Sequence, residues 1–293
     1  MLDVKAAGKI SYNIMKISIA VPSYNHEKYI YDCLKSIQDQ DYDNYEVLIS
    51  DGGSTDQSLT IIKDFCVTDN RFTLASVSDD GQADAIMKSF SVATGEIFCF
   101  LNSDDVYLNK DVFNDVATSF LNNKDADIIS FSGCYIDSNG KYIKQVNLRY
   151  HPLDSTSNMK YRTAVLQPAT FWKREVYLSI PINIEYHFVF DAMFFYQAYS
   201  KFSWLDLPKS VAGHRLHGLN KSLQICSERI SELAELERLK FGSLSFRVFY
   251  LKIISGLIAT FGHIPFIGKK INRAIYYIVN SVSFITFYRM PSI

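Results

Sequence analysis

Short apolar runs alternate with amphipathic segments over the first third of the chain. The runs are rich in β-branched residues and are followed by turn residues, which is typical of strands. The segments between them repeat apolar residues every three or four positions, which predicts helices. Because strands that alternate with helices form βαβ units, the pattern predicts an α/β fold with a mostly parallel sheet. The predicted strands are residues 16–22, 45–50, 71–75 and 96–101, and the predicted helices are residues 27–40, 56–65 and 82–93.

The regular alternation ends at about residue 127. Asn139-Gly140 stands between two apolar runs, and this dipeptide is a strong signal for a β-hairpin. Residues 164–173 have an extended pattern, whereas the apolar spacing predicts helices over residues 190–199 and 226–241. The other predicted strands are residues 127–131, 134–136, 142–146, 203–207 and 210–212.

Polar clusters follow the four predicted strands of the first part, at the point where each strand ends. Because ligands bind beyond the carboxyl ends of parallel strands, we expect these clusters to meet in one site. Asp104 and Asp105 are adjacent carboxylates, which repel each other unless a cation or a donor lies nearby. Such oxygens suit Mg²⁺ or Mn²⁺, and the alternative is that one aspartate caps the next helix. The clusters are residues 23–25, 51–56, 79–84 and 102–105.

The charge of the chain is unevenly distributed. The 293 residues include 30 Lys and Arg and 31 Asp and Glu, and 48% are hydrophobic. This composition excludes a disordered or fibrous chain. Residues 1–237 hold 22 basic and all 31 acidic groups, a sum of −9, whereas residues 238–293 hold 8 basic and no acidic groups, a sum of +8. An acidic body argues against nucleic acid as a partner.

The cysteines and apolar segments restrict the compartment. Five cysteines without a CxxC pair predict buried thiols rather than a disulfide framework or zinc site, which fits a reducing compartment. Residues 1–14 lack the apolar core of a secretory signal and are expected to be a loose extension. The best apolar segments, residues 248–262 and 274–288, contain Lys252 and Asn280, so neither is a clean membrane span.

Several motifs, in this order, resemble the motif series of the family 2 glycosyltransferases. These are inverting, metal-dependent enzymes with the GT-A fold, a Rossmann-like, mostly parallel sheet flanked by helices. The resemblance implies a catalytic domain over residues 15–225, with a nucleotide-sugar-binding half over residues 15–126 and an acceptor-side half over residues 127–225. The motifs are Val-Pro-Ser-Tyr-Asn at 21–25, Ile-Ser-Asp-Gly-Gly-Ser-Thr-Asp at 49–56, Asp-Gly-Gln-Ala-Asp at 80–84 with Ala-Thr-Gly-Glu at 93–96, and Leu-Asn-Ser-Asp-Asp at 101–105.

The resemblance implies donor-side roles for residues in these motifs. Asp51 would hydrogen-bond the base, although by itself it also suits a turn. Asp104 would contact the ribose or sugar, and Asp105 would bind the metal, Mg²⁺ or Mn²⁺. Many relatives carry aspartate where this chain has Asn102, which leaves the metal-side pair intact. The residues that would line the nucleotide entrance or lie beside the donor sugar are Pro22, Ser23, Tyr24, Asn25, Asp80 and Gly81.

The resemblance places the catalytic base in the second half. Asp191 matches the position of the family's catalytic aspartate, although Phe190 stands where relatives often have glutamate. Glu185 is the competing base, and Asp191 could instead cap its helix.

Other second-half residues would contact the donor or acceptor. In Gly-His-Arg-Leu-His at 213–217, Arg215 would neutralise the diphosphate and His217 would bind the metal or the leaving phosphate, with His214 a weaker candidate. Gln167 and Trp172 would touch the acceptor or donor sugar, and the alternative for Trp172 is a core aromatic.

The resemblance implies transfer of a sugar from a nucleotide-sugar to an acceptor hydroxyl, with inversion. A UDP-sugar is favoured because Asp51 suits uracil, and the expected acceptor is a glycan or polyprenyl-linked glycan of bacterial O-antigen, capsule or exopolysaccharide. One alternative is a catalytically degenerate scaffold of the same fold at the membrane surface. The other is a sugar nucleotidyltransferase, which normally needs a glycine-rich phosphate loop where this chain has residues 22–26.

The basic end of the chain suggests a membrane surface. Residues 226–293 are predicted to be an amphipathic helical region, and residues 243–293 place basic side chains beside many aromatic ones. Such segments lie at anionic membrane surfaces, so we expect a cytoplasmic protein held on the inner face of the cell membrane. The alternative is a helical region packed on the catalytic domain or on a second subunit.

Overall fold

Four parallel strands form the first half of the central sheet. The computed structural model describes residues 15–146, 165–218, 220, 226–243 and 246–261. Each strand pairs in parallel with its neighbour in the order β3-β2-β1-β4, which confirms the predicted βαβ arrangement. The carboxyl ends of these strands therefore meet at one edge of the sheet. The strands are β1 (Ile17–Ser23), β2 (Tyr45–Asp51), β3 (Phe72–Ser76) and β4 (Ile97–Phe100).

The second half of the nine-stranded sheet is mixed. β8 (Thr170–Lys173) lies antiparallel between β4 and β6 (Ile128–Ile136), and β9 (Trp204–Arg215) runs parallel to β6. β5 (Val106–Tyr107) pairs with β9, and β7 (Tyr142–Val146) forms the predicted hairpin with β6.

β6 and β9 are each one strand where the sequence predicted two. The pairing between β6 and β9 skips Pro208 and Lys209, so these two residues lie in a bulge of β9. Proline has no N–H to donate, and the bulge lets it interrupt the apolar pattern of the sequence without ending the strand. A Cβ at Gly133 would lie 2.2 Å from the Ala212 carbonyl oxygen, so only glycine lets the two strands run this close.

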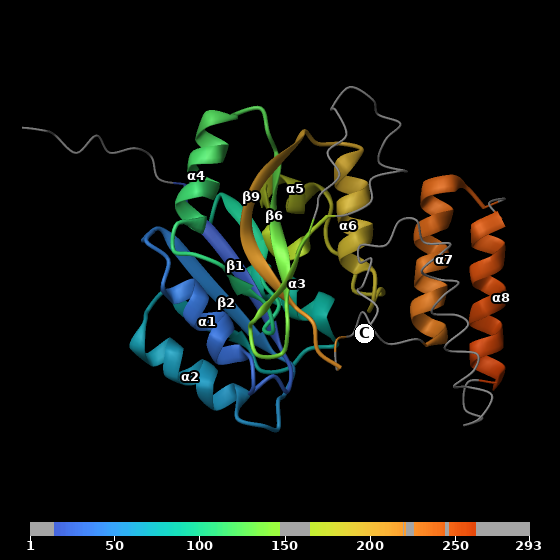
Figure 1. Cartoon of the computed structure of the whole chain (residues 1–293), viewed down its shortest axis with the longest axis horizontal. Coiled ribbons are helices and arrows are strands. Elements are labelled where there is room, and N and C mark those ends of the chain that lie inside the picture. The colour runs from blue at the N-terminus through green and yellow to red at the C-terminus, as the bar shows by residue number, and fades with distance from the viewer. Residues whose placement is uncertain (1–14, 147–164, 219, 221–225, 244–245, 262–293) are drawn as a thin grey trace, which may run out of the picture.

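Helices cover both faces of the sheet (Figure 1). Successive side chains of β1 point to opposite faces of the sheet, so Ile17, Ile19 and Val21 lie on one face and Ala20 lies on the other. The first face packs against α1 (Ile30–Gln38), α2 (Ser58–Thr68) and α4 (Val112–Asn122), and the second packs against α3 (Gln82–Ser91), α5 (Arg174–Ser179) and α6 (Phe190–Tyr199). α4 and α5 are not among the predicted elements, although Val112, Val116 and Phe120 repeat with helical spacing.

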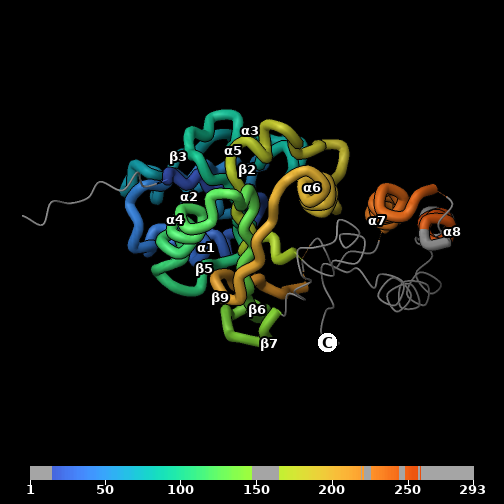
Figure 2. The backbone as a smooth tube through the Cα atoms, turned by 90° about the horizontal axis from the view of Figure 1, so that it is seen from above, coloured from blue at the N-terminus to red at the C-terminus, as the bar shows by residue number. Residues whose placement is uncertain are grey.

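Two further helices extend beside α6. α7 (Ser227–Phe241), which was predicted, and α8 (Phe246–Phe261) pack against each other through Ile230, Leu251 and Ile254. Figures 1 and 2 both show α7 between α6 and α8. None of the helices in the described part of the chain has the length and apolar character needed to cross a bilayer. Most of the predicted membrane-binding segment, residues 262–293, lies outside the described residues.

The motif at residues 93–96 lies at the opposite edge of the sheet from the polar clusters. The Thr94 backbone N–H donates to Glu46 at 2.7 Å, and the Gly95 N–H donates to the Ser18 hydroxyl at 2.8 Å. Burial opposes ionisation of Glu46, but hydrogen bonds from Lys16 and Ser18 outweigh it and lower the pKa of Glu46. This motif therefore joins the amino ends of the strands and takes no part in the site.

Candidate active site

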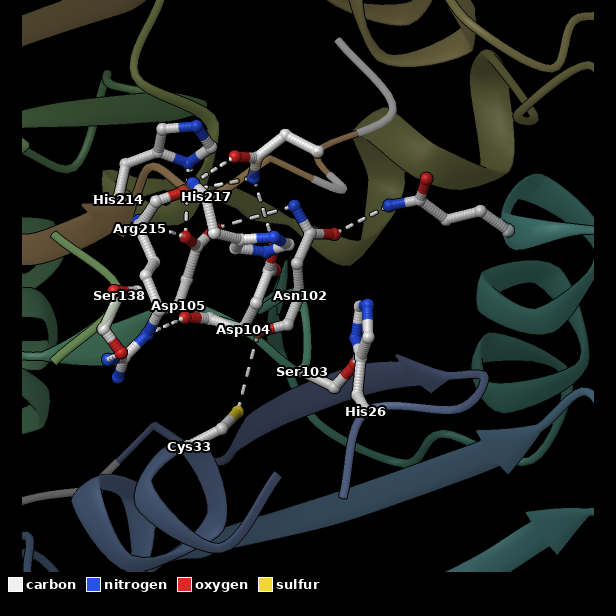
Figure 3. Close-up of polar contacts among 12 residues, drawn as sticks. His26, Cys33, Asn102, Ser103, Asp104, Asp105, Ser138, His214, Arg215 and His217 are labelled. Atoms are coloured by element: carbon white, nitrogen blue, oxygen red, sulfur yellow. Dashed lines mark hydrogen bonds and ion pairs between the residues drawn. The ribbon is translucent and has the colours of Figure 1, made fainter. Parts of the chain in front are cut away.

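Two aspartates after β4 form the centre of a polar cluster (Figure 3). Oδ2 of Asp104 lies 2.9 Å from Nε2 of His217. The Asp105 carboxylate accepts the backbone N–H of Arg215 at 2.9 Å and lies 3.0 Å from Nδ1 of His214. The end of β9 and the residues just after it therefore supply partners to both carboxylates.

Burial and the surrounding histidines determine the ionisation of the pair. Burial would raise the pKa of Asp104, but the hydrogen bond from His217 and the positive potential of His26 lower it below its usual value. Burial and the neighbouring Asp104 raise the pKa of Asp105. Burial would lower the pKa of His214, but the charge of Asp105 raises it. The environment therefore shifts the pKa values of the two adjacent carboxylates in opposite directions.

Arg215 lies buried behind the aspartates. Its side chain is only 1% exposed. Nε donates to the backbone oxygen of Asp104 at 2.7 Å, and Nη1 donates to that of Ser138 at 3.2 Å. Nη2 lies 3.4 Å from the Asp32 carboxylate, and the guanidinium lies 5.0 Å from the centre of the Tyr29 ring. A direct contact between Arg215 and a diphosphate, which was expected, does not fit this burial. The guanidinium instead bonds the main chain of Asp104.

Asn102 connects the acidic pair to two glutamines. Its Oδ1 accepts from Gln82 at 2.6 Å, and its Nδ2 donates to Gln167 at 3.3 Å and to Asp105 at 3.4 Å. Gln167 is buried and donates in turn to the Phe100 carbonyl at 2.5 Å. A carboxylate in place of Asn102 could only accept, so the asparagine suits this position. Gln167, expected at a sugar, is used within this network.

The loops after β1 and β2 are joined into one wall by hydrogen bonds. Asn25 has a φ of 52°, which asparagine tolerates, and its Oδ1 accepts from the Thr55 N–H at 2.8 Å. The Asn25 N–H donates to Ser54 at 2.8 Å. Asp51 is buried and accepts both the N–H and the hydroxyl of Ser54 at 2.7 Å. Asp51 therefore orders the loop in which it lies.

Tyr24 and Asp79 approach each other across Gly52. A Cβ on Gly52 would lie 3.1 Å from both Asp79 carboxylate oxygens and 3.3 Å from the Tyr24 ring. Tyr24 is 59% exposed, whereas Pro22 and Ser23 are buried. Burial raises the pKa of Asp79. Within the described residues the Ser23 hydroxyl has no hydrogen-bond partner, which is typical of a group that a ligand completes.

The loop after β3 presents Asp79 rather than Asp80 to this wall. Asp80 is exposed, and its backbone N–H donates to Asp84 at 2.9 Å. Gly81 has a φ of 112°, which favours glycine, and a Cβ there would lie 3.4 Å from Nδ1 of His187. The loop before α6 therefore reaches the donor-side loops through His187.

Asp191 lies in the first turn of α6 and contributes to the electrostatic potential at His214. Glu185 is exposed in the preceding turn, where its Oε2 accepts from Asn183 at 3.5 Å. Trp172 is fully buried, with its ring 5.1 Å from that of Phe194. The expectation that Trp172 touches a sugar is therefore wrong, because it is a core aromatic.

Three side chains of the cluster were not singled out in the sequence. Tyr29 stacks on His217 with ring centres 4.7 Å apart, and Nδ1 of His26 lies 2.6 Å from the Ser103 hydroxyl. Asn220 donates to Asp104 at 3.3 Å. The position of His26, directly after the motif at residues 21–25, is a signal that could have indicated it.

Solved structures show that this is a glycosyltransferase fold. TarS 1–349 of Staphylococcus aureus with UDP-GlcNAc has a TM-score of 0.62 and 19% identity over 93% of this chain and 82% of that chain. The mannosyltransferase PcManGT of Pyrobaculum calidifontis, with GDP-Man and Mn²⁺, has a TM-score of 0.55 and 17% identity over 95% and 82%. The chain belongs to glycosyl transferase family 2, whose family model matches residues 18–201.

Curated relatives match part of the chain. Glycosyltransferase GlyG of Streptococcus pneumoniae is 37% identical over 114 residues, which are 39% of this chain and 37% of the relative. The poly(ribitol-phosphate) beta-N-acetylglucosaminyltransferase TarS of Staphylococcus aureus is 34% identical over 119 residues, 40% of this chain and 20% of that protein. The chain therefore aligns with well under two thirds of either relative.

Replacing Asn102 with aspartate should destabilise the fold. The new carboxylate would face the acceptor oxygens of Asp105 and Gln167, and a buried polar atom without a partner costs about 1–3 kcal/mol. Denaturant unfolding of Asn102→Asp at neutral pH measures the loss. Asn109→Asp is the control, because this exposed side chain only accepts the Asp111 N–H, so a change within about 0.5 kcal/mol is expected. Equal stabilities of the two variants would contradict the network.

Proposed function

We propose that the protein is an inverting glycosyltransferase that moves a sugar from a nucleotide-sugar to an acceptor hydroxyl. The observation that carries this proposal is the convergence at one edge of the sheet. The Asp104–Asp105 cluster and the wall follow four parallel strands whose carboxyl ends meet there, and Asp191 at the start of α6 contributes to the electrostatic potential at His214. Loops at the carboxyl ends of parallel strands are where a nucleotide-dependent enzyme binds its ligand, which supports the proposal.

The wall that contains Tyr24 is the proposed nucleotide end of the donor site. Its exposed ring offers a face on which a base can stack, and the half-buried Asp79 and the unpaired Ser23 hydroxyl offer polar groups beside it. Asp51 stabilises this wall through its hydrogen bonds with Ser54. A UDP-sugar is the favoured donor, in keeping with the UDP-GlcNAc bound in the TarS structure that shares this fold.

Asp191 is the proposed general base. It would take the proton of the acceptor hydroxyl while the oxygen attacks the anomeric carbon from the side opposite the leaving nucleoside diphosphate. One such displacement inverts the anomeric centre. Glu185 is less suited, because it lies in an exposed turn rather than at the start of the helix beside the acidic cluster.

Asp104 and His217 are the proposed metal ligands, in place of the earlier assignment of Asp105. The hydrogen bond from His217 lowers the pKa of Asp104 in spite of burial, whereas Asp105 is fully buried and bonded to His214 and to the Arg215 N–H. The described residues contain no group of three or more His, Cys, Asp or Glu that could hold an ion alone. Two protein ligands fit Mg²⁺ or Mn²⁺ when substrate phosphates complete the shell. When bound, such an ion would neutralise the charge of the diphosphate.

The alternative functions receive less support. A sugar nucleotidyltransferase lacks its glycine-rich phosphate loop here, since the segment after β1 is Tyr24 to His26 and is bonded to the next loop. A degenerate scaffold of the same fold would not need the pairing of Asp104 with His217 or an aspartate at position 191.

Replacing Asp191 with asparagine should abolish transfer while donor binding survives. The amide cannot take a proton, so kcat should fall by roughly 10²–10⁴-fold, with the affinity for UDP unchanged. A screen of nucleotide-sugars by thermal shift selects the donor, and product assays measure the rate. Glu185→Gln is the matched control and should retain activity. Normal turnover by Asp191→Asn would show that the base lies elsewhere.

Removal of divalent metal should stop transfer, and Mn²⁺ or Mg²⁺ should restore it. His217→Ala should raise the metal concentration needed for half-maximal rate, because one of two protein ligands is lost. The measurement is initial rate against free metal concentration in a buffered chelator. Full activity in excess EDTA would reject the metal role.

The proposed acceptor is a glycan or polyprenyl-linked glycan of a bacterial surface polysaccharide, reached by a protein held on the inner face of the membrane. The relative TarS, whose name describes transfer of N-acetylglucosamine to a poly(ribitol-phosphate), supports a polymeric acceptor. On α8, Phe249 is 62% and Ile253 45% exposed, with the exposed Lys252 between them. An apolar and basic surface of this kind suits an anionic bilayer.

The full chain should therefore sediment with anionic vesicles and less with zwitterionic ones. Phe249→Ser with Ile253→Ser should weaken this binding by roughly tenfold or more, since each large apolar side chain contributes ~1.5–3 kcal/mol when fully buried. Val67→Ser, an 86% exposed valine on α2, is the control. Absence of sedimentation with either vesicle type would reject the membrane surface as a partner, and equal sedimentation with both would reject the preference for anionic lipid.

A further inference from the structure

A buried carboxylate from α7 binds the start of α6. Glu232 is 8% exposed. Its Oε1 accepts the backbone N–H of His187 at 2.8 Å, and its Oε2 accepts those of Phe188 at 2.8 Å and Val189 at 3.0 Å. Three backbone donors therefore converge on one side chain that is more than forty residues away in the sequence.

One of these donors belongs to the N-cap of α6, Val189, and the other two, from His187 and Phe188, lie in the segment that leads into the helix. The first N–H groups of a helix have no acceptor within it, and Ser, Thr, Asp or Asn at the N-cap normally supplies one. The N-cap of α6 is Val189, whose side chain makes no such bond. A carboxylate at this end also faces the positive pole of the helix dipole. Glu232 thus fixes, from another helix, the N-cap of α6 and the two residues before it.

The helix that starts here carries the proposed base. Asp191 is the second residue of α6, and its Oδ1 lies 2.7 Å from the Ala192 N–H. The direction and position of the Asp191 side chain therefore depend on where the first turn of α6 begins. The same segment sets His187 against Gly81 in the donor-side loop.

Packing between α6 and α7 keeps Glu232 in place. Leu236 of α7 packs with Val189 and Met193, and the Tyr196 hydroxyl donates to the Leu239 carbonyl at 3.1 Å. The opposite face of α7 packs on α8. α7 lies beyond residue 201, where the family match ends, so this contact belongs to the part of the chain outside the family domain.

We propose that Glu232 is a positioning residue for the transfer reaction, acting through Asp191 by fixing the start of α6. This inference rests on the proposed role of Asp191 as the base. It assigns to α7 a part in catalysis without any contact with the substrate. A displacement of about 1 Å at a catalytic group can cost ~10²-fold in rate, so one capping carboxylate is enough to matter.

The test compares Glu232→Gln and Glu232→Ala with the full-length parent. Glutamine keeps one acceptor oxygen but turns an NH₂ toward backbone donors, so it should retain part of the function, and alanine should retain less. We expect kcat to fall by about tenfold or more in Glu232→Ala, with the KM for the donor and UDP affinity within about threefold. Glu235→Gln is the matched control, because Glu235 is on the same helix and pairs with Arg238 on the surface.

A second measurement does not depend on activity. Amide hydrogen exchange at Phe188 and Val189 should quicken by about tenfold or more in Glu232→Ala, which removes both acceptor oxygens, and stay unchanged in Glu235→Gln. Unchanged exchange would overturn the cap itself. Faster exchange with an unchanged kcat, in a protein that transfers sugar, would overturn the positioning role. Absence of transfer by the parent would instead count against the proposed function and leave the exchange result to decide the cap.

Discussion

The site depends on the contact between Asp105 and the end of β9. Two adjacent carboxylates in a buried position are unstable unless donors and positive charge compensate them. Here the Arg215 N–H and the His214 ring meet Asp105, and the guanidinium of Arg215 holds the Asp104 main chain. β5, which follows the acidic pair directly, pairs with β9 through Val106 and Gly213. Val106, the residue directly after the acidic pair, therefore already pairs with β9, the strand whose groups compensate the two carboxylates.

The first half of the fold could be predicted because its signals are local. Strand length, apolar spacing and turn residues all act within one segment, and parallel pairing then brings the strand ends together. The second half depends on contacts between distant segments. Pro208 is accommodated by a bulge, and Gly133 is explained only by the Ala212 carbonyl beside it. Likewise, residue type marked Asp104 and His217 as polar candidates, but only burial shows that Trp172 lies in the core.

Residues next to each other in a motif can take different roles, and burial decides between them. Asp80 matches the family position but is exposed, whereas Asp79 lies against Gly52 with its pKa raised by burial. Asp104 and Asp105 also differ, because hydrogen bonding lowers the pKa of Asp104 in spite of burial, whereas burial raises the pKa of Asp105. Part of the negative charge of residues 1–237 thus comes from carboxylates of the candidate site, and each of these carboxylates has a different environment. The proposed function needs such differences, because binding phosphate, holding a metal and acting as a base require carboxylates in different environments.

The basic end of the chain is connected to this acidic body rather than merely attached to it. α7 buries Glu232 against α6 on one side and packs on α8 on the other. Because a buried carboxylate that loses its donors is costly, α7 and the start of α6 are held in one arrangement. α7 is therefore the element that links α8 to the segment in front of Asp191, through packing on one side and three hydrogen bonds on the other. The position of the proposed base thus depends on contacts with a helix that lies beyond the residues matched by the family model.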